Sequence, residues 1–177
     1  MGDPRKQRKK FSKPGHPWQR ERILAEKEIL KQYGLKRKNE IWKMSSMLQK
    51  FLYRAKTIIA QTNPQSEIEK RQLLVRLYSL GLLKQDSRIE DVLNLTLKDI
   101  MERRLQTLLC RKNIAPSMMQ ARQFITHEHV IVGSKKITVP SYLVSISEEP
   151  SIKLVRAFNI QAAAQQKTEK TEEVKQE

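Results

Sequence analysis

The feature that most restricts the fold of this chain is an apolar stripe between residues 39 and 60. Steps of three and four residues separate its members, which are Ile41, Met44, Leu48, Phe51, Ala55 and Ile58. This spacing places all six side chains on one side of an α-helix, where they can be buried together. Asn39 is a favourable N-cap residue, so the sequence predicts a long helix from Asn39 that ends before Asn63 and Pro64.

Helix-start and helix-stop residues predict three further helices around this one. The first begins at Pro17 and ends at Gly34. Its apolar residues available for one buried face are Ile23, Leu24, Leu30 and Tyr33. Two pairs have the spacing of capping boxes, Ser66 with Glu69 and Thr96 with Asp99. They predict helices over 69–80, stopped at Gly81, and over 99–112.

The segment after residue 115 predicts a short helix followed by a small sheet. Ser117 and Gln120 again have capping spacing, and the helix carries Met118, Ala121, Phe124 and Ile125 inward. The stretch VIVGSKKITV predicts a hairpin with its tight turn at Gly133 and Ser134. Residues 142–146 and 152–155 are further strand candidates.

These elements predict an α+β, mostly helical fold in four parts. Residues 1–17 combine prolines, glycines and basic residues and predict a disordered basic arm. Residues 18–98 form a helical platform, and residues 99–156 form short helices packed on a small, mainly antiparallel sheet. Residues 157–177 lack hydrophobic periodicity and predict a disordered, low-complexity tail.

The charge is large and unevenly distributed. The chain has 35 Lys and Arg against 19 Asp and Glu, a net charge of +16. Residues 1–60 alone carry a net +12, residues 61–98 carry +1, residues 99–156 carry +4, and the tail carries −1. An excess of this size repels itself in a compact free protein, so a polyanion is the expected partner.

Several classes of protein are disfavoured. No apolar run approaches the roughly 18 residues of a transmembrane helix, and no apolar region follows the N-terminal charges, so neither secretion nor a membrane span is expected. Cys110 is the single cysteine, which excludes an internal disulfide and a multi-thiolate zinc site.

The triplet His127, Glu128 and His129 has three interpretations from the residues alone. Two histidines on one face of a strand could share a metal ion, but the third histidine, His16, lies in the arm, so the ligands are too few. An acid-base centre also lacks a nucleophile and an oxyanion site nearby. The structural interpretation is that the triplet ends the short helix and turns into a strand.

Cations and neutral polar groups near this triplet form a candidate phosphate-binding cluster. Arg104 and Arg111 are seven residues apart and should share one helix face, while Arg122 should lie opposite the apolar positions of the next helix. The candidate residues of this region are Arg104, Arg111, Arg122, Lys135, Lys136, Gln120, Gln123 and His127. For any single cation, a solvated surface position remains the alternative.

The N-terminal third supplies a second candidate surface for a polyanion. Lys43, Lys50, Arg54 and Lys56 fall off the apolar stripe of the long helix. The candidate phosphate contacts of this part are Arg5, Lys6, Arg8, Lys9, Lys10, Lys43, Lys50 and Arg54. Several such contacts at once would hold a nucleic acid through its phosphates.

The order of short motifs resembles a known family. RRLQT, QARQ, the H-x-H-V-x-V pattern of HEHVIV, and PSY after the hairpin are similar to the S-four RNA-binding domain. Outside that domain, GDPRKQRKKF, HPW, YGLKRKNEIWK, LVRLYSLGLL and LNLTLKDI resemble the small-subunit ribosomal protein S-four family of archaea and eukaryotes. The resemblance covers roughly residues 2–156.

This resemblance implies a structural constituent of the small ribosomal subunit, cytoplasmic and ribosome-bound, with no catalysis, cofactor, metal, membrane or small-molecule substrate. It implies direct binding to small-subunit ribosomal RNA, a role in nucleating assembly of the subunit body, neighbouring ribosomal proteins near the messenger entrance, and an influence on translational accuracy. The positions matched to family motifs as RNA contacts are Arg103, Arg104, Arg122, Gln123, His127, Lys135 and Lys136.

The chain departs from the family pattern at three places. Met118 stands where many S-four domains have arginine, Glu128 stands where glycine is usual between the histidines, and Gly133-Ser134 replaces Asn-Gly in the hairpin. The N-terminal cysteines with which bacterial relatives bind zinc are missing, which favours the archaeal and eukaryotic branch.

Two alternatives remain at the level of the sequence. S-four domains also accompany RNA-modifying enzymes, but residues 1–98 contain no nucleotide-binding or nucleophile motif. The other alternative is a stand-alone S-four-domain RNA-binding or chaperone factor acting on ribosomes.

Overall fold

The computed structural model describes residues 9, 11–61 and 63–155. The chain divides into two compact units, Met1–Glu102 and Arg103–Glu177. Among the described residues, no helix is both long enough and apolar enough to cross a membrane. The predicted tail, residues 157–177, lies outside the described residues, as does most of the predicted basic arm.

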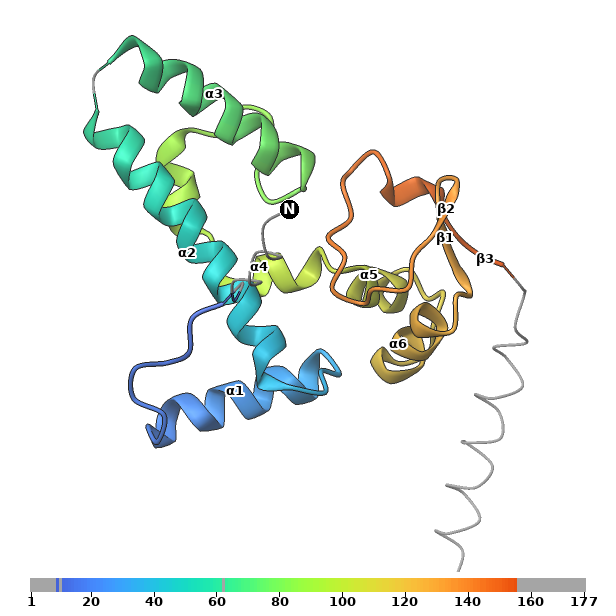
Figure 1. Cartoon of the computed structure of the whole chain (residues 1–177). Coiled ribbons are helices and arrows are strands. Elements are labelled where there is room, and N and C mark those ends of the chain that lie inside the picture. Colours follow the sequence, from blue (N-terminus) through green and yellow to red (C-terminus); the bar gives the residue numbers. More distant parts are fainter. Residues whose placement is uncertain (1–8, 10, 62, 156–177) are drawn as a thin grey trace, which may run out of the picture. The chain divides into compact units, whose positions relative to one another are not determined.

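In its described part, the first unit contains helices and connecting segments but no strand. It contains α1 (Arg20–Gln32), α2 (Lys38–Ala60), α3 (Pro64–Ser79), the short 3-10 helix η1 (Ile89–Asn94) and α4 (Leu97–Glu102). Helix α2 contacts the other four, with α1 and α3 toward its opposite ends (Figure 1). It is therefore the central element around which this unit is built.

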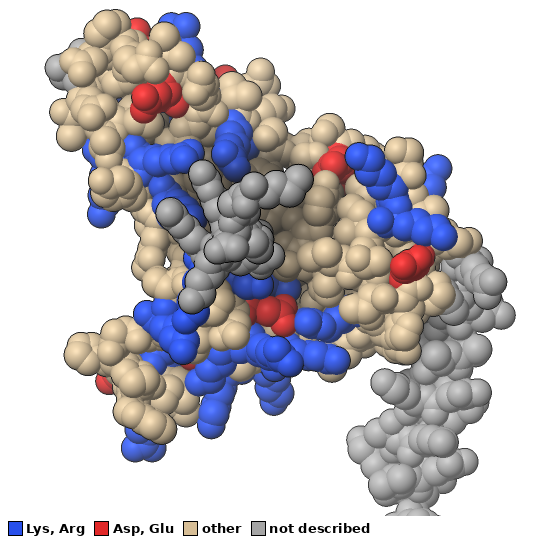
Figure 2. Space-filling model, viewed as in Figure 1, with Lys and Arg blue, Asp and Glu red and all other residues tan. Residues whose placement is uncertain are grey.

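The apolar stripe predicted for α2 is confirmed. Ile41, Met44, Phe51, Ala55 and Ile58 are buried, and Leu48 is half-buried. The four cations off the stripe, Lys43, Lys50, Arg54 and Lys56, are exposed. Figure 2 shows Lys and Arg side chains gathered over the region of α1 and α2, while Asp and Glu form smaller, separate patches. The helix thus buries one side and presents cations on the rest.

Two predicted N-caps are wrong, Asn39 for the long helix and Ser66 for the next one. Helix α2 starts before Asn39, because the N–H of Glu40 already donates to the carbonyl of Arg37. Helix α3 starts at Pro64 after the N-cap Asn63, so Ser66 lies inside the helix and bonds the Asn63 carbonyl. Proline at the first helical position needs no N–H partner, and this start replaces the expected capping box.

Other helix ends match the sequence. Gly34 and Gly81, the predicted helix stops, both have positive φ, at 58° and 70°. The carboxylate of Asp99 accepts hydrogen bonds from the N–H and hydroxyl of Thr96, each at 2.8 Å, as the capping spacing predicted. Tyr33, the C-cap of α1, is buried, but Leu24 within the helix is 49% exposed, so the expected apolar face is only partly used.

A buried carboxylate joins α1 to α2. Glu26 is 6% exposed, and its carboxylate accepts a hydrogen bond from the indole of Trp42 at 3.0 Å. It also pairs with Arg22 and, at 3.2 Å, with Lys38. Burial acts to raise the pKa of Glu26, but the bonds from Trp42, Lys38 and Arg22 outweigh it and hold that pKa below its ordinary value.

The Glu26 cluster predicts an acid-dependent loss of stability. Because the pKa of Glu26 is lower in the folded than in the unfolded chain, folding favours the ionised form. The corresponding stabilisation is present above the pKa of an unfolded-chain glutamate, about 4.3, and is lost as the pH falls through the lower folded pKa. We expect Glu26→Gln to lower the free energy of unfolding by about 1–3 kcal/mol at pH 7.

The difference between the Glu26→Gln variant and the unchanged protein should shrink on acidification below pH 4.5. Urea denaturation at pH 7 and at pH 3.5, followed by circular dichroism, measures both values. The matched control is Glu28→Gln, which removes an exposed carboxylate from the same helix. A gap between Glu26→Gln and the unchanged protein that stays constant with pH would contradict the assigned role.

The second unit packs two short helices against a small sheet. It contains α5 (Leu105–Arg111), α6 (Met118–Thr126), β1 (Val130–Val132), β2 (Lys135–Lys136), the 3-10 helix η2 (Glu149–Ser151) and β3 (Ile152–Leu154). The three strands are antiparallel in the order β2-β1-β3, with Val132 opposite both Lys135 and Ile152. The predicted helix, hairpin and C-terminal strand are confirmed.

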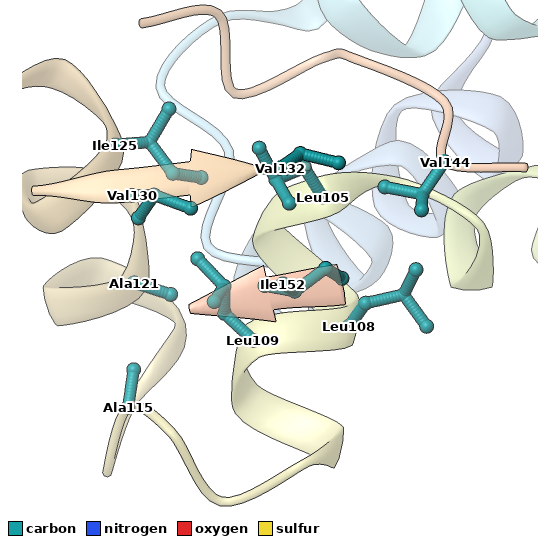
Figure 3. Close-up of a cluster of buried hydrophobic side chains, with 10 residues drawn as sticks. All are labelled: Leu105, Leu108, Leu109, Ala115, Ala121, Ile125, Val130, Val132, Val144 and Ile152. Atoms are coloured by element: carbon teal, nitrogen blue, oxygen red, sulfur yellow. The ribbon is translucent and has the colours of Figure 1, made fainter. Parts of the chain in front are cut away.

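The core of this unit is aliphatic, and its side chains converge between the helices and the sheet (Figure 3). Its members are Leu105, Leu108, Leu109, Ala115, Ala121, Ile125, Val130, Val132, Val144 and Ile152. The low aromatic content of the chain, 6%, agrees with a core of this kind.

Two sequence predictions fail at the start of this unit. The helix expected over 99–112 is split into α4 and α5, because residues 103–104 leave helical geometry and pair with residues 142–144. Leu105 N–H donates to the Tyr142 carbonyl at 2.8 Å, and Val144 N–H donates to the Arg103 carbonyl at 3.1 Å. The expected strand at 142–146 is reduced to one antiparallel bridge, between Arg104 and Leu143.

Candidate nucleic-acid interface

The first candidate surface lies on α2 and consists of Lys43, Lys50 and Arg54, here called the α2 cation surface. Their spacing of seven and four residues places them on one side of the helix, beside the buried stripe. All three side chains are exposed. A row of cations along one helix is suited to successive phosphates of a nucleic-acid backbone.

A surface hollow of about 670 Å³ adjoins the α2 cation surface. Its lining residues are Lys9, Phe11, Ser12, Ser46, Gln49, Lys50, Tyr53 and Arg54. The Phe11 ring packs against Trp42 with centroids 6.1 Å apart, and Ser12 N–H donates to Ser46 Oγ at 3.1 Å. Tyr53 is 73% exposed. Cations beside an open aromatic ring are typical of surfaces that bind phosphates and stack bases.

Among the predicted contacts of the N-terminal arm, Lys9 lies within the described residues. Lys9 is exposed and lines the hollow together with Lys50 and Arg54. The other predicted arm contacts, Arg5, Lys6, Arg8 and Lys10, lie outside the described residues. Sequence reasoning did not select Tyr53 or Gln49, although both fall off the apolar stripe and a helical projection would have shown them beside Lys50 and Arg54.

In the second unit, two predicted arginines are held by contacts within the fold, with Arg104 buried and Arg103 half-buried. Arg104 is 1% exposed and is extended, so its predicted position on one helix face with Arg111 is wrong. Arg103 donates to the Glu149 carboxylate at 2.9 Å and to the Val144 carbonyl at 3.1 Å. Arg111, by contrast, is exposed at the end of α5.

Glu149 is shared by a second cation that sequence reasoning missed. Lys112 Nζ donates to the Glu149 carbonyl and lies 3.6 Å from its carboxylate. Glu149 therefore connects the residues flanking α5 to η2. Forty-six residues separate Arg103 from Glu149, so no local spacing could have predicted the pair.

Helix α6 presents neutral polar groups rather than a cation at its outermost position. Gln123 and His127 are exposed, while Arg122 is half-buried beside the core position Ala121. The expectation that Arg122 lies opposite the apolar positions is therefore wrong, because Gln123 occupies that place. A hollow of about 230 Å³ is lined by Gln120, Gln123, Phe124, His127 and His129.

The triplet His127-Glu128-His129 ends α6 and turns into β1, as the structural interpretation predicted. Glu128 N–H donates to the Ile125 carbonyl at 3.2 Å, and His129 N–H donates to the Phe124 carbonyl at 2.9 Å. This bond pattern is a Schellman motif with Glu128 at the position that glycine prefers, and Glu128 has a φ of 62°. Within the described part, no group of three or more His, Cys, Asp or Glu is placed to hold a metal ion.

The Schellman motif predicts that Glu128→Gly stabilises the protein. A side chain at positive φ is strained, and glycine removes that strain, so we expect the free energy of unfolding to rise by about 1 kcal/mol. Glu128→Ala is the matched control because it removes the charge but keeps the strained Cβ. Urea denaturation should show a gain for glycine and little change for alanine; equal gains would indicate that charge, not backbone geometry, is the cause.

The hairpin lysines Lys135 and Lys136 are both exposed on β2. The positive charge of Lys135 acts on the carboxylate of Glu148. The Ser145 N–H bond mainly holds the pKa of Glu148 below its usual value, with smaller contributions from Tyr142 and Lys135 against the effect of burial. The hydrogen bond from Tyr142 to Glu148, at 2.8 Å, in turn raises the pKa of Tyr142.

Comparison with known proteins gives consistent matches. The S4 domain family model matches residues 103–149, which begin at the start of the second unit. The chain is 47% identical over 176 residues to small ribosomal subunit protein uS4 of Methanococcus aeolicus, covering 99% of this chain and 98% of the relative. It is 45% identical over 152 residues to the uS4 protein of Ignicoccus hospitalis, covering 86% of this chain and 92% of the relative.

Proposed function

The chain belongs to the uS4 family of small ribosomal subunit proteins, and from this membership we propose that it is a structural constituent of the small ribosomal subunit that binds small-subunit ribosomal RNA directly. The observation that carries the proposal is the similarity to uS4 proteins across both units. Such a protein acts on the ribosome in the cytoplasm.

The length of the match favours this function over the two alternatives. An RNA-modifying enzyme or a stand-alone factor would share the S4 domain alone, whereas the uS4 similarity includes the helices of the first unit. The family is a ribosomal one and not an enzyme class. The proposed role contains no catalytic step.

The proposed binding mechanism is electrostatic. In the first unit, Lys9 and the α2 cation surface contact phosphates, with Tyr53 available to stack a base. In the second unit, the exposed cations Arg111, Lys135 and Lys136 contact phosphates. Several contacts of this kind fix the geometry of a folded RNA through its shape and backbone, with few bases read. Arg104 is no longer part of the proposed interface because it is buried.

The finer parts of the role extend the same mechanism. A basic protein that holds an RNA junction in one geometry can act early in assembly of the subunit body. We further place the protein beside other small-subunit ribosomal proteins near the messenger entrance, with an influence on translational accuracy. The location and these roles follow from the family resemblance. A map of RNA and protein cross-links within the subunit would test the location.

A salt titration tests the mechanism. Filter binding of the full chain to small-subunit ribosomal RNA should lose affinity steeply with salt, with a log-log slope of about −0.7 to −0.9 for each phosphate contact. At least four of the exposed cations named above are expected to contribute, so the total slope should be steeper than about −3. An affinity that is flat between low and physiological salt would contradict the electrostatic mechanism.

A further inference from the structure

The hollow on α6 differs in chemistry from the cation surfaces. Gln120, Gln123, Phe124 and His127 are spaced by three, one and three residues, so they lie on neighbouring positions of one helix face. His129 joins them because the Schellman turn brings the chain back beside Phe124, whose ring meets the His129 ring edge-on at 6.4 Å. No Lys or Arg is among the residues that line this hollow.

Two rings of the hollow are arranged for stacking. The imidazoles of His127 and His129 are 23° from parallel, with centroids 6.3 Å apart. A third ring between them would require about 7 Å, twice the contact distance of carbon atoms. A planar ligand would therefore stack on an outer ring face, extending the pair, and His127 is the exposed member.

The edge of such a ligand would meet two carboxamides. Gln120 and Gln123 each carry an NH₂ donor and a carbonyl acceptor, which can match the mixed donor and acceptor edge of any nucleobase. The volume of about 230 Å³ is below the roughly 300–1,000 Å³ of pockets for larger ligands. It suits one planar ring system rather than a whole cofactor.

Charge also favours a base over a phosphate. Glu128 is exposed and lies in the chain between His127 and His129, two residues that line the hollow, although Glu128 itself does not line it. This carboxylate would repel a phosphate but not an uncharged base.

We propose that the hollow of Gln120, Gln123, Phe124, His127 and His129 binds one unpaired nucleobase of the RNA. The base stacks on an imidazole, and the two amides bond its edge. This inference rests on the proposed function, since the same RNA supplies the base while the cations hold its backbone. It assigns to α6 a base-contacting role that the electrostatic mechanism does not contain.

Imidazole signals in nuclear magnetic resonance spectra test this site directly, because the chain contains only three histidines. The probes are an octauridylate, whose bases are unpaired, and an abasic octamer with the same phosphates. We expect the ring signals of His127 and His129 in the full chain to shift with octauridylate and to stay in place with the abasic octamer. Equal shifts with both octamers, or none with either, would overturn the proposal.

The variant Gln123→Ala/His127→Ala provides a second readout. We expect it to bind octauridylate at least about fivefold more weakly than the unchanged chain, the low end of the range for a lost base stack, and to bind the abasic octamer equally well. An unchanged affinity for octauridylate would contradict the site. Filter binding to small-subunit ribosomal RNA distinguishes failure of the base site from failure of the proposed function. If the chain binds this RNA but the imidazole signals do not shift, only the base site is contradicted. If the chain does not bind this RNA, the proposed function is contradicted.

Discussion

Replacing Lys50 and Arg54 with glutamate is expected to weaken binding to small-subunit ribosomal RNA by about 10- to 30-fold at physiological salt. Both side chains are exposed on the α2 cation surface and line the same hollow as Lys9 and Tyr53. Each lost phosphate contact also removes about 0.7–0.9 from the slope of log affinity against log salt, so the slope should become shallower by about 1.4–1.8. Filter binding across a salt series measures both quantities.

The matched control replaces Lys70 and Arg71, an exposed pair on α3, with glutamate. This control changes the net charge by the same amount but lies outside the α2 cation surface. We expect its affinity to fall by less than about threefold, with both variants keeping the helical circular dichroism of the unchanged chain. Equal losses in the two variants would mean that overall charge, rather than this surface, determines the affinity.

Truncating Ile125 to alanine is expected to lower the free energy of unfolding of the second unit by about 2–5 kcal/mol. Ile125 is fully buried on α6 and packs in the core with α5, β1 and β3 (Figure 3). Its removal leaves a cavity at the junction of helices and sheet, where the antiparallel pairing of β1 prevents complete collapse. Urea denaturation followed by circular dichroism measures the change.

Met119→Ala is the control for the Ile125 variant. Met119 is on the same helix but 56% exposed, so its truncation should change the free energy of unfolding by no more than about 0.5 kcal/mol. If the two truncations cost the same, the buried cluster does not provide the stability assigned to it. Intact binding of RNA by the Met119 variant would show that the helix surface tolerates the change.

The sequence predicted those parts of the fold that depend on local periodicity. The α2 stripe, the stops at Gly34 and Gly81, and the end of α6 at His127 all follow from spacing and backbone preference within a few residues. The order of short motifs also identified the family, which the comparison with uS4 proteins confirms.

The failures have a common physical cause in contacts between distant parts of the chain. Helical propensity alone predicts one helix through residues 103–104, but hydrogen bonds to residues 142–144 draw this segment into extended geometry. The same pairing buries Arg104 and so removes it from the candidate interface. Salt bridges such as Arg103 with Glu149 likewise join residues that no sequence spacing connects.

The candidate site likewise contains residues that local spacing predicts and a residue that depends on the folded backbone. Lys43, Lys50 and Arg54 could be placed from the helical period, because exposure on α2 follows from the buried stripe. The α6 hollow could be placed only in part. Gln120, Gln123 and His127 were grouped from the sequence, but His129 joins them only through the positive φ of Glu128.

Co-sedimentation of the full chain with purified small ribosomal subunits is the most direct test of the central claim. After a wash in high salt, a structural constituent should remain in the small-subunit fraction at one copy per subunit, since many contacts within an assembled particle dissociate together only slowly. Substoichiometric recovery, or recovery with large subunits instead, would contradict the account and favour a stand-alone factor.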